Sequence, residues 1–140
     1  MISGSTLCDS FKVELLEGVH NLSADAIFMA LYDDSASIGP STTNYVTGGE
    51  IAGPGYTAGG QQLTGPQILG PVNSTAYATF NDPVWASSSL TARGALLYNQ
   101  SKQQRAIAAL DFGSDVSSNN GSFRVKFPPP GQTTALIRLI

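Results

Sequence analysis

A stretch rich in glycine, proline, serine and threonine, residues 35–71, constrains the fold more than any other feature of the sequence. Glycine and proline interrupt helices, and all four residue types favour turns, so that no long helix fits into this stretch. The isolated apolar residues within it leave room only for short strands joined by tight turns. The sequence therefore predicts a mainly β fold.

Apolar and alternating patterns on both sides of that stretch predict the strands of the core. Residues 26–32 are apolar on both faces and stop at two aspartates, which is typical of a central strand. Residues 122–127 alternate phenylalanine and valine with polar residues, and we expect them to form a hairpin with residues 106–112. The turn cluster at 116–121 would join the two. Further strand patterns cover residues 76–80 and 90–98.

One amphipathic helix is expected near the N-terminus, over residues 11–22. Phe11, Leu15, Val19 and Leu22 follow one another at spacings of four, four and three, which places them on one helix face, and Gly18 weakens its end. A chain of 140 residues buries one core but not two. We therefore expect a single domain, residues 1–140, with a β-sandwich or jelly-roll-like barrel and this helix packed across it.

The low charge of the chain limits its partners. Charged residues make up 12% of the sequence, and the seven basic residues are scattered over a chain of net charge −3, so that the basic stripe of a nucleic-acid-binding protein is missing. No apolar run approaches the roughly 20 residues that cross a bilayer, and the N-terminus does not read as a signal peptide. We expect a soluble, cytosolically made chain whose neutral polar surface suits packed assemblies.

The candidate catalytic and metal-binding residues do not combine into a site. His20, the single histidine, falls at the frayed end of the predicted helix, where an imidazole is favoured on electrostatic grounds alone. Asp82, Asp111 and Asp115 lie beside turn residues, where aspartate commonly bonds to its own backbone. Cys8 has neither a disulfide partner nor nearby metal ligands, and we expect it to be buried. The sequence predicts no enzyme activity, no cofactor and no metal.

Several stretches resemble a family of small structural virion proteins of tailed bacteriophages. They are FKV and GVHNL at residues 11–13 and 18–22, ALY at 30–32, GPGYTAGG at 53–60, LTARGALLY at 90–98, and LDFGSD with NGSF at 110–115 and 120–123. The likeness covers residues 11–127 and keeps the order and spacing of these stretches. The three prolines at 128–130 and the apolar end of the chain depart from it.

The resemblance implies a non-enzymatic component of the virion, made in the host cytoplasm. A capsid decoration (cement) protein is the first expectation, with the major capsid protein or neighbouring virion proteins as partners and a homo-oligomer, most naturally a trimer, as its form. The alternatives are a neck, tail or baseplate subunit, and a carbohydrate-binding module for host attachment in which an exposed Trp85 would stack on sugars.

We expect two segments to contact these partners. One is the long loop, and the other is the apolar tail, which forms either a last strand of the chain's own sheet or an arm that adds to a neighbour's sheet. The residues concerned are Tyr45, Tyr56 and Leu63 in the loop and Leu136, Ile137, Leu139 and Ile140 in the tail.

Overall fold

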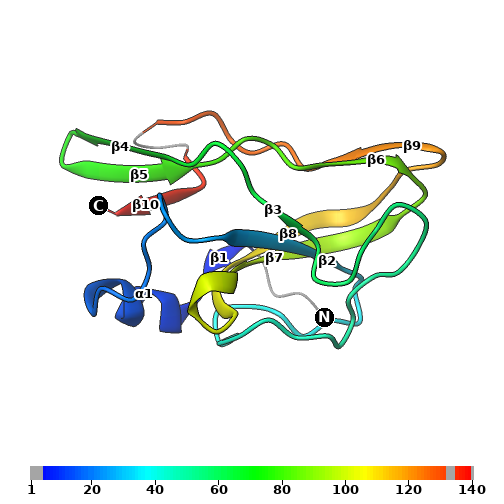
Figure 1. Ribbon diagram of the computed structural model, residues 1–140, viewed down its shortest axis with the longest axis horizontal. Coiled ribbons are helices and arrows are strands. Elements are labelled where there is room, and N and C mark those ends of the chain that lie inside the picture. Colours follow the sequence, from blue (N-terminus) through cyan, green and yellow to red (C-terminus); the bar gives the residue numbers. More distant parts are fainter. Residues whose placement is uncertain (1–4, 132–134, 140) are drawn as a thin grey trace.

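Strands dominate the computed structural model, which describes residues 5–131 and 135–139 (Figure 1). The elements in chain order are β1 (Thr6–Leu7), α1 (Asp9–Leu16), β2 (Ile27–Tyr32), β3 (Gln61–Gln62), β4 (Gln67–Val72), β5 (Thr75–Thr79), β6 (Val84–Ser88), β7 (Thr91–Asn99), the 3-10 turn η1 (Gln100–Lys102), β8 (Arg105–Ser117), β9 (Gly121–Arg124) and β10 (Ile137–Leu139). The predicted mainly β fold with one short N-terminal helix is confirmed.

A long antiparallel ribbon organises these strands. Its two halves are the pair β7–β8 and the pair β6–β9, which follow one another along the same two chain segments. The chain reverses once, at residues 100–104, where Gln103 and Gln104 take positive φ angles. Ser88 is buried where the ribbon bends, and its Oγ lies 2.8 Å from the carbonyl oxygen of Trp85 and 2.9 Å from Oγ of Ser118.

The ribbon shows that the predicted hairpin of residues 106–112 with residues 122–127 is wrong. β8 pairs with β7 and β1, whereas β9 pairs with β6. The polar cluster at residues 116–121, which the sequence predicts to reverse the chain, only bends the ribbon. After it, β9 continues opposite β6, which lies in the same chain segment as β7. The true reversal at residues 100–104 contains no glycine, and so it lacks the usual sequence signal of a hairpin turn.

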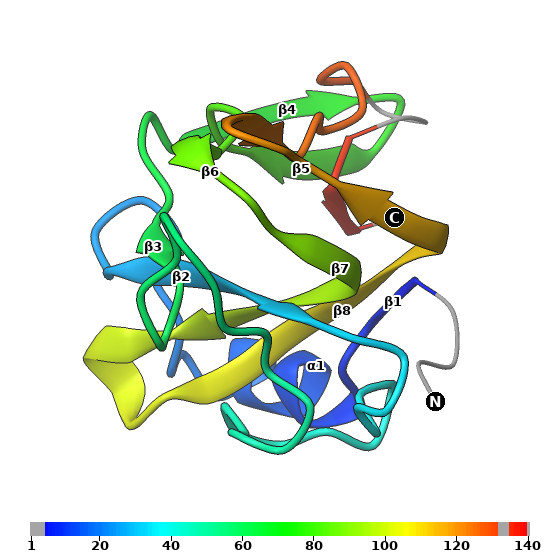
Figure 2. The ribbon, with the colours of Figure 1, turned by 90° about the vertical axis from the view of Figure 1, so that its right-hand side faces the viewer.

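The sheets lie in two layers with the core between them (Figures 1 and 2). One layer is a five-stranded sheet in the order β1-β8-β7-β2-β3, and the other contains the sheet β10-β5-β4 and the pair β6–β9. β2 is almost wholly buried, as predicted for residues 26–32. Figure 2 shows α1 on the outer face of the five-stranded sheet, opposite the second layer. This layered arrangement agrees with the predicted β-sandwich.

The helix is shorter than its apolar spacing predicts. It ends at Leu16, and Gly18 follows with a φ of +74°. The amides of Gly18 and Val19 bond to the carbonyls of Leu15 and Glu14, at 3.2 and 3.0 Å, which is the hydrogen-bond pattern of a glycine-terminated helix. The predicted helix over residues 11–22 is therefore wrong beyond its first half. Among the described helices, none is long and apolar enough to span a membrane.

Candidate functional site

His20 is a buried structural residue. Its imidazole is fully enclosed, with Nε2 2.9 Å from Oε1 of Glu14 and Nδ1 3.0 Å from Nδ2 of Asn99. An amide nitrogen only donates hydrogen bonds, so Nδ1 accepts and Nε2 carries the proton toward Glu14. Both ring nitrogens are thus engaged, and the ring has no face open to a substrate.

The polar contacts of His20 continue into a chain of charges that ties α1 to the turn between β7 and β8. Arg105 lies 3.0 Å from Glu14, and Lys102 lies 3.0 Å from Asp25, which also accepts a hydrogen bond from Asn99 at 2.8 Å. Burial raises the pKa of Asp25, but the hydrogen bonds from Asn99 and the Asn21 amide and the ammonium group of Lys102 outweigh it and hold this pKa below its usual value.

Two of the other candidate carboxylates, those of Asp82 and Asp111, accept hydrogen bonds from backbone amides. Asp82 accepts a hydrogen bond from the amide of Phe127 at 2.8 Å and pairs with Arg124 at 2.8 Å. Oδ1 of Asp111 accepts a hydrogen bond from the amide of Gly113 at 2.8 Å, and Asp115 is exposed. Within residues 5–131 and 135–139, no three His, Cys, Asp or Glu side chains are grouped so that they could hold a metal ion. Cys8 is buried and free, as expected.

One carboxylate, that of Glu50, holds the long loop between β2 and β3 against the core. Its Oε1 accepts a hydrogen bond from the Tyr45 hydroxyl at 2.5 Å. Its Oε2 accepts hydrogen bonds from the Tyr56 hydroxyl at 2.5 Å and from the amide of Gly59 at 2.7 Å. The hydroxyl of Tyr98 in β7 donates to the carbonyl of Gly59 at 2.5 Å. These bonds give a glycine-rich loop a fixed path over the sheet.

The loop residues that we predicted as partner contacts are therefore engaged within the chain. Tyr45 and Tyr56 are partly buried, and their hydroxyls point to Glu50. Leu63 is only 5% exposed, and its amide bonds to the carbonyl of Ile27 at 2.7 Å. The structure corrects the placement of Leu63, which is a core residue and has no surface to offer a partner.

Trp85 is also a core residue. It is 5% exposed, and its ring lies 6.1 Å from that of Tyr56 and 6.2 Å from that of Phe123, measured between ring centroids. An exposed face for stacking on a sugar, which the carbohydrate-binding alternative requires of Trp85, is therefore missing.

The described residues of the tail, 135–139, include a strand that pairs within the chain's own sheet. β10 pairs antiparallel with β5, with Ile137 opposite Ala78 and Leu139 opposite Ala76, so that the first of the two alternatives for the tail holds for these residues. Ile140 lies outside the described residues. Because side chains alternate along a strand, the tail lines hollows on both of its faces, Leu136 and Arg138 on one face and Ile137 and Leu139 on the other.

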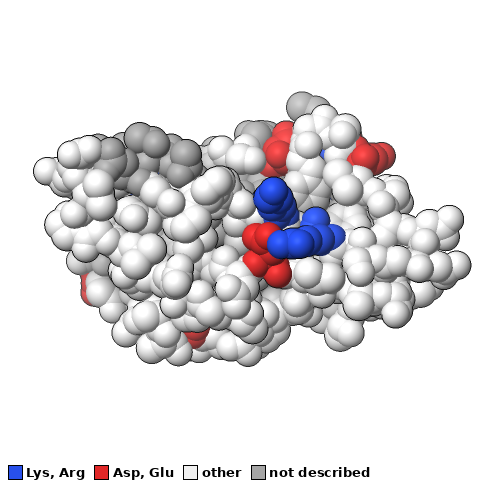
Figure 3. Space-filling model, turned by 90° about the horizontal axis from the view of Figure 1, so that it is seen from above, with Lys and Arg blue, Asp and Glu red and all other residues white. Residues whose placement is uncertain are grey.

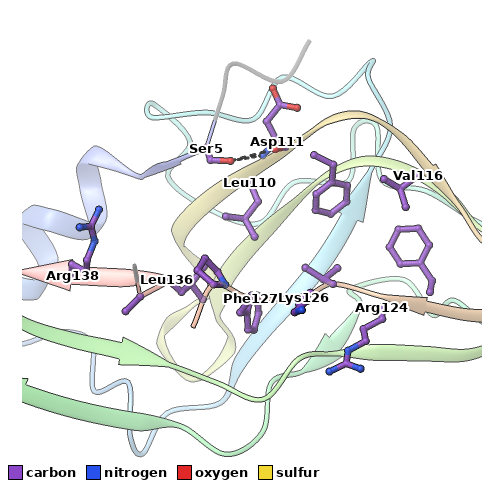
Figure 4. A pocket seen from close by; sticks show the side chains of 14 residues that line it. Ser5, Leu110, Asp111, Val116, Arg124, Lys126, Phe127, Leu136 and Arg138 are labelled. Atoms are coloured by element: carbon purple, nitrogen blue, oxygen red, sulfur yellow. Dashed lines mark hydrogen bonds between the residues drawn. The ribbon is translucent and has the colours of Figure 1, made fainter. Parts of the chain in front are cut away.

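The hollow beside Leu136 and Arg138, which we call the basic cleft, has a volume of about 490 Å³. In Figure 4 the apolar side chains of Leu110, Leu136 and Phe127 lie in its middle, with Arg138 at one end and Arg124 at the other. The hydroxyl of Ser5 accepts a hydrogen bond from the amide of Asp111 at the rim, at 2.9 Å. The cleft thus combines an apolar floor with charged ends.

The hollow beside Ile137 and Leu139, which we call the apolar groove, has a volume of about 500 Å³ and lies between the α1 region and the sheet β10-β5-β4. Its lining includes Leu15, Leu22, Ile68, Tyr77, Ile137 and Leu139. Ile68 is 53% exposed and Leu139 is 52% exposed, although both are large apolar side chains. Apolar side chains gathered around a groove are typical of a surface that binds another molecule.

Charge is sparse on the surface of the second layer. Figure 3, seen from that side, shows a largely uncharged face with basic side chains gathered beside acidic ones near its centre. Such a face repels further copies only weakly. The charges therefore do not oppose close packing against a neighbour on this side.

No protein-family model, no curated protein and no solved structure matches the chain. The evidence for its function therefore comes from its own side chains and surfaces. Sequence reasoning found the tail strand but missed Ile68, Arg124 and Lys126, which the fold brings beside it. The available signal was the pair of apolar residues Ile68 and Leu69, which stand between Pro66 and Pro71 in a polar segment.

Proposed function

We propose that this protein is a non-enzymatic structural subunit that works by binding neighbouring protein chains, and that it is a capsid decoration protein of a tailed-phage virion. The apolar groove is the observation that carries the assembly part of the proposal. Ile68 and Leu139 stand half exposed beside it, and covering them with a partner would remove apolar surface from water.

Support for the virion comes from the stretches that resemble tailed-phage structural proteins. Two of them have a structural task that can be seen in this fold. The stretch GPGYTAGG, residues 53–60, carries two of the groups that meet Glu50, and the stretch LDFGSD, residues 110–115, forms the irregular part of β8. Both tasks belong to folding, so that the partner contacts that we propose lie elsewhere on the surface.

The partners that we propose are the major capsid protein and further copies of this chain, as a trimer at the junctions of capsid subunits. A neck or tail subunit would use the same surfaces, and the number of copies in the particle distinguishes the two positions. A weak contact suffices in either place, because many symmetry-related sites act together.

The protein should bind expanded heads that lack it and should raise their melting temperature, and substitutions in the apolar groove should weaken this binding. Leu139→Ser and Ile68→Ser each remove apolar area worth about 1 kcal/mol of binding, or about a fivefold loss of affinity. The measurement is sedimentation of the protein with heads over a range of concentrations, followed by differential scanning calorimetry.

Val84→Ser is the matched control, because Val84 is 41% exposed on β6 and does not line the groove. It should bind heads as the unaltered protein does. Saturating protein that leaves the melting temperature of the heads unchanged would rule out a decoration protein, and equal losses for Val84→Ser and Leu139→Ser would rule out the groove as the contact.

A further inference from the structure

The walls of the basic cleft are strands with an open edge. β8 pairs with β1 only at Ala108 and Ala109, and the residues after Asp111 have β7 as their one partner strand in the described part of the chain. β9 pairs on one side with β6, and the amide of Val125 bonds to the carbonyl of Pro83 on that same side. Since backbone groups alternate between the two edges of a strand, those of Arg124 and Lys126 face the other edge.

The floor of the cleft is built from core side chains. Phe123 and Phe127 are buried, and the Phe123 ring lies 6.5 Å from that of Phe112, measured between centroids. Leu110 and Leu136 complete an apolar surface between the charged ends (Figure 4). An occupant therefore needs apolar groups along its length.

The charged side chains that line the cleft favour a bound molecule with negative charge. All seven basic side chains lie in the described residues, and five of them form ion pairs within the chain: Lys12, Arg93, Lys102, Arg105 and Arg124. The two that remain, Lys126 and Arg138, both line the basic cleft. In a chain of net charge −3, the two basic side chains that form no ion pair among the described residues thus lie at one hollow, although Lys126 also attracts the carboxylate of Asp82. The one acidic residue that lines the cleft, Asp111, lies 3.5 Å from Arg93.

We propose that the basic cleft binds an extended segment of a neighbouring protein chain, one in which carboxylate side chains alternate with apolar ones. The segment adds as a strand to the open edge of β9, its apolar side chains cover the floor, and its carboxylates meet Lys126 and Arg138. The open strand edge favours a peptide over a small amphiphilic anion, because only a peptide supplies backbone partners along that edge. This inference rests on the proposed function and names the chemistry of a partner.

A synthetic peptide tests the inference directly. The probe is a blocked peptide of about eight residues, a common strand length, that alternates valine with glutamate and carries a fluorescent label. Fluorescence anisotropy should show saturable binding that weakens as the salt concentration rises to about 0.5 M. Lys126→Gln and Arg138→Gln should each weaken binding about threefold, as expected for one exposed ion pair.

Three controls isolate charge and strand pairing. Lys12→Gln removes the same charge from exposed Lys12 on α1, outside the cleft, and should bind as the unaltered protein does. A peptide with lysine in place of glutamate should not bind. A glutamate peptide with alternate amides methylated has lost the donors that face the strand edge, and it should not bind either.

Equal binding of the methylated peptide, or equal losses for Lys12→Gln and Lys126→Gln, would overturn the inference. Binding of decanoate in the cleft without any binding of the peptide would also overturn it and would assign the cleft to small amphiphiles. Head binding is measured on the same preparation. Heads that bind the protein while the peptide does not would reject this partner and leave the proposed function standing.

Discussion

Gly60→Ala is expected to lower the free energy of unfolding by about 4 kcal/mol or more. Losses of this size are exceptional and arise from backbone conflicts or large changes in the core. A β-carbon on Gly60 would lie 1.7 Å from the carbonyl oxygen of Met29 and 2.6 Å from its carbonyl carbon. Gly60 also has a φ of +81°, which favours glycine. The loop would have to leave β2, and the pairing of Gln61 with Met29 would be lost.

Gly113→Ala is the matched control for this substitution. Gly113 has almost the same φ, +82°, but a β-carbon there would meet nothing within 4 Å. It should lose only the conformational cost of a left-handed alanine, about 1–2 kcal/mol. Urea unfolding followed by circular dichroism measures both variants. Similar losses for the two would mean that the loop does not approach β2 as closely as described.

The protein is expected to unfold steeply between about pH 10 and pH 12, where four buried or partly buried tyrosines oppose ionisation. Burial raises the pKa of Tyr98 to about 12, and it raises the pKa values of Tyr32, Tyr45 and Tyr56 further, with the Glu50 carboxylate adding to the effect. Burial also raises the pKa of the Cys8 thiol to about 11.

The direction in which stability changes with pH follows from the number of protons that each state binds. Above pH 10 the unfolded chain loses its tyrosine protons while the folded chain keeps them, so stability falls as pH rises. Each group contributes about 1.4 kcal/mol per pH unit, so that the four tyrosines together contribute about 5 kcal/mol per pH unit. The Cys8 thiol adds to this slope up to about pH 11. Urea unfolding at a series of alkaline pH values measures this slope, which Tyr98→Phe should reduce by about a quarter. The chain has five tyrosines, of which Tyr77 is not among these four. A rise of tyrosinate absorbance near pH 10 that corresponds to more than one tyrosine, while the circular dichroism stays native, would contradict this prediction.

The elements that the sequence predicts well are those whose structure follows from the pattern of their own residues. Residues 26–32 are apolar on both faces, and β2 follows from that pattern alone. Gly18 indicated a helix end, but the apolar spacing of Val19 and Leu22 concealed how early the helix stops. Leu22 is buried after the helix has ended, so its apolar character reflects the core and not a helix face.

The features that could not be predicted depend on residues far apart in the chain. Glu50 is a single acidic residue in a polar stretch, and its tyrosine partners come from two sides of it. Lys126 and Arg138 are separated by the three prolines, and the cleft that they share exists only after β10 has paired with β5. The pairing of β9 with β6 was missed for the same reason, since nothing local links the two segments.

We propose above all that the chain is a repeated structural subunit of a virion shell. The number of copies of this chain relative to the major capsid protein, determined by quantitative mass spectrometry of purified virions, tests it most directly. We expect a ratio near one, which on an icosahedral shell means on the order of hundreds of copies. A ratio of about a few per cent, as for a subunit of one neck or tail ring, would contradict the decoration role.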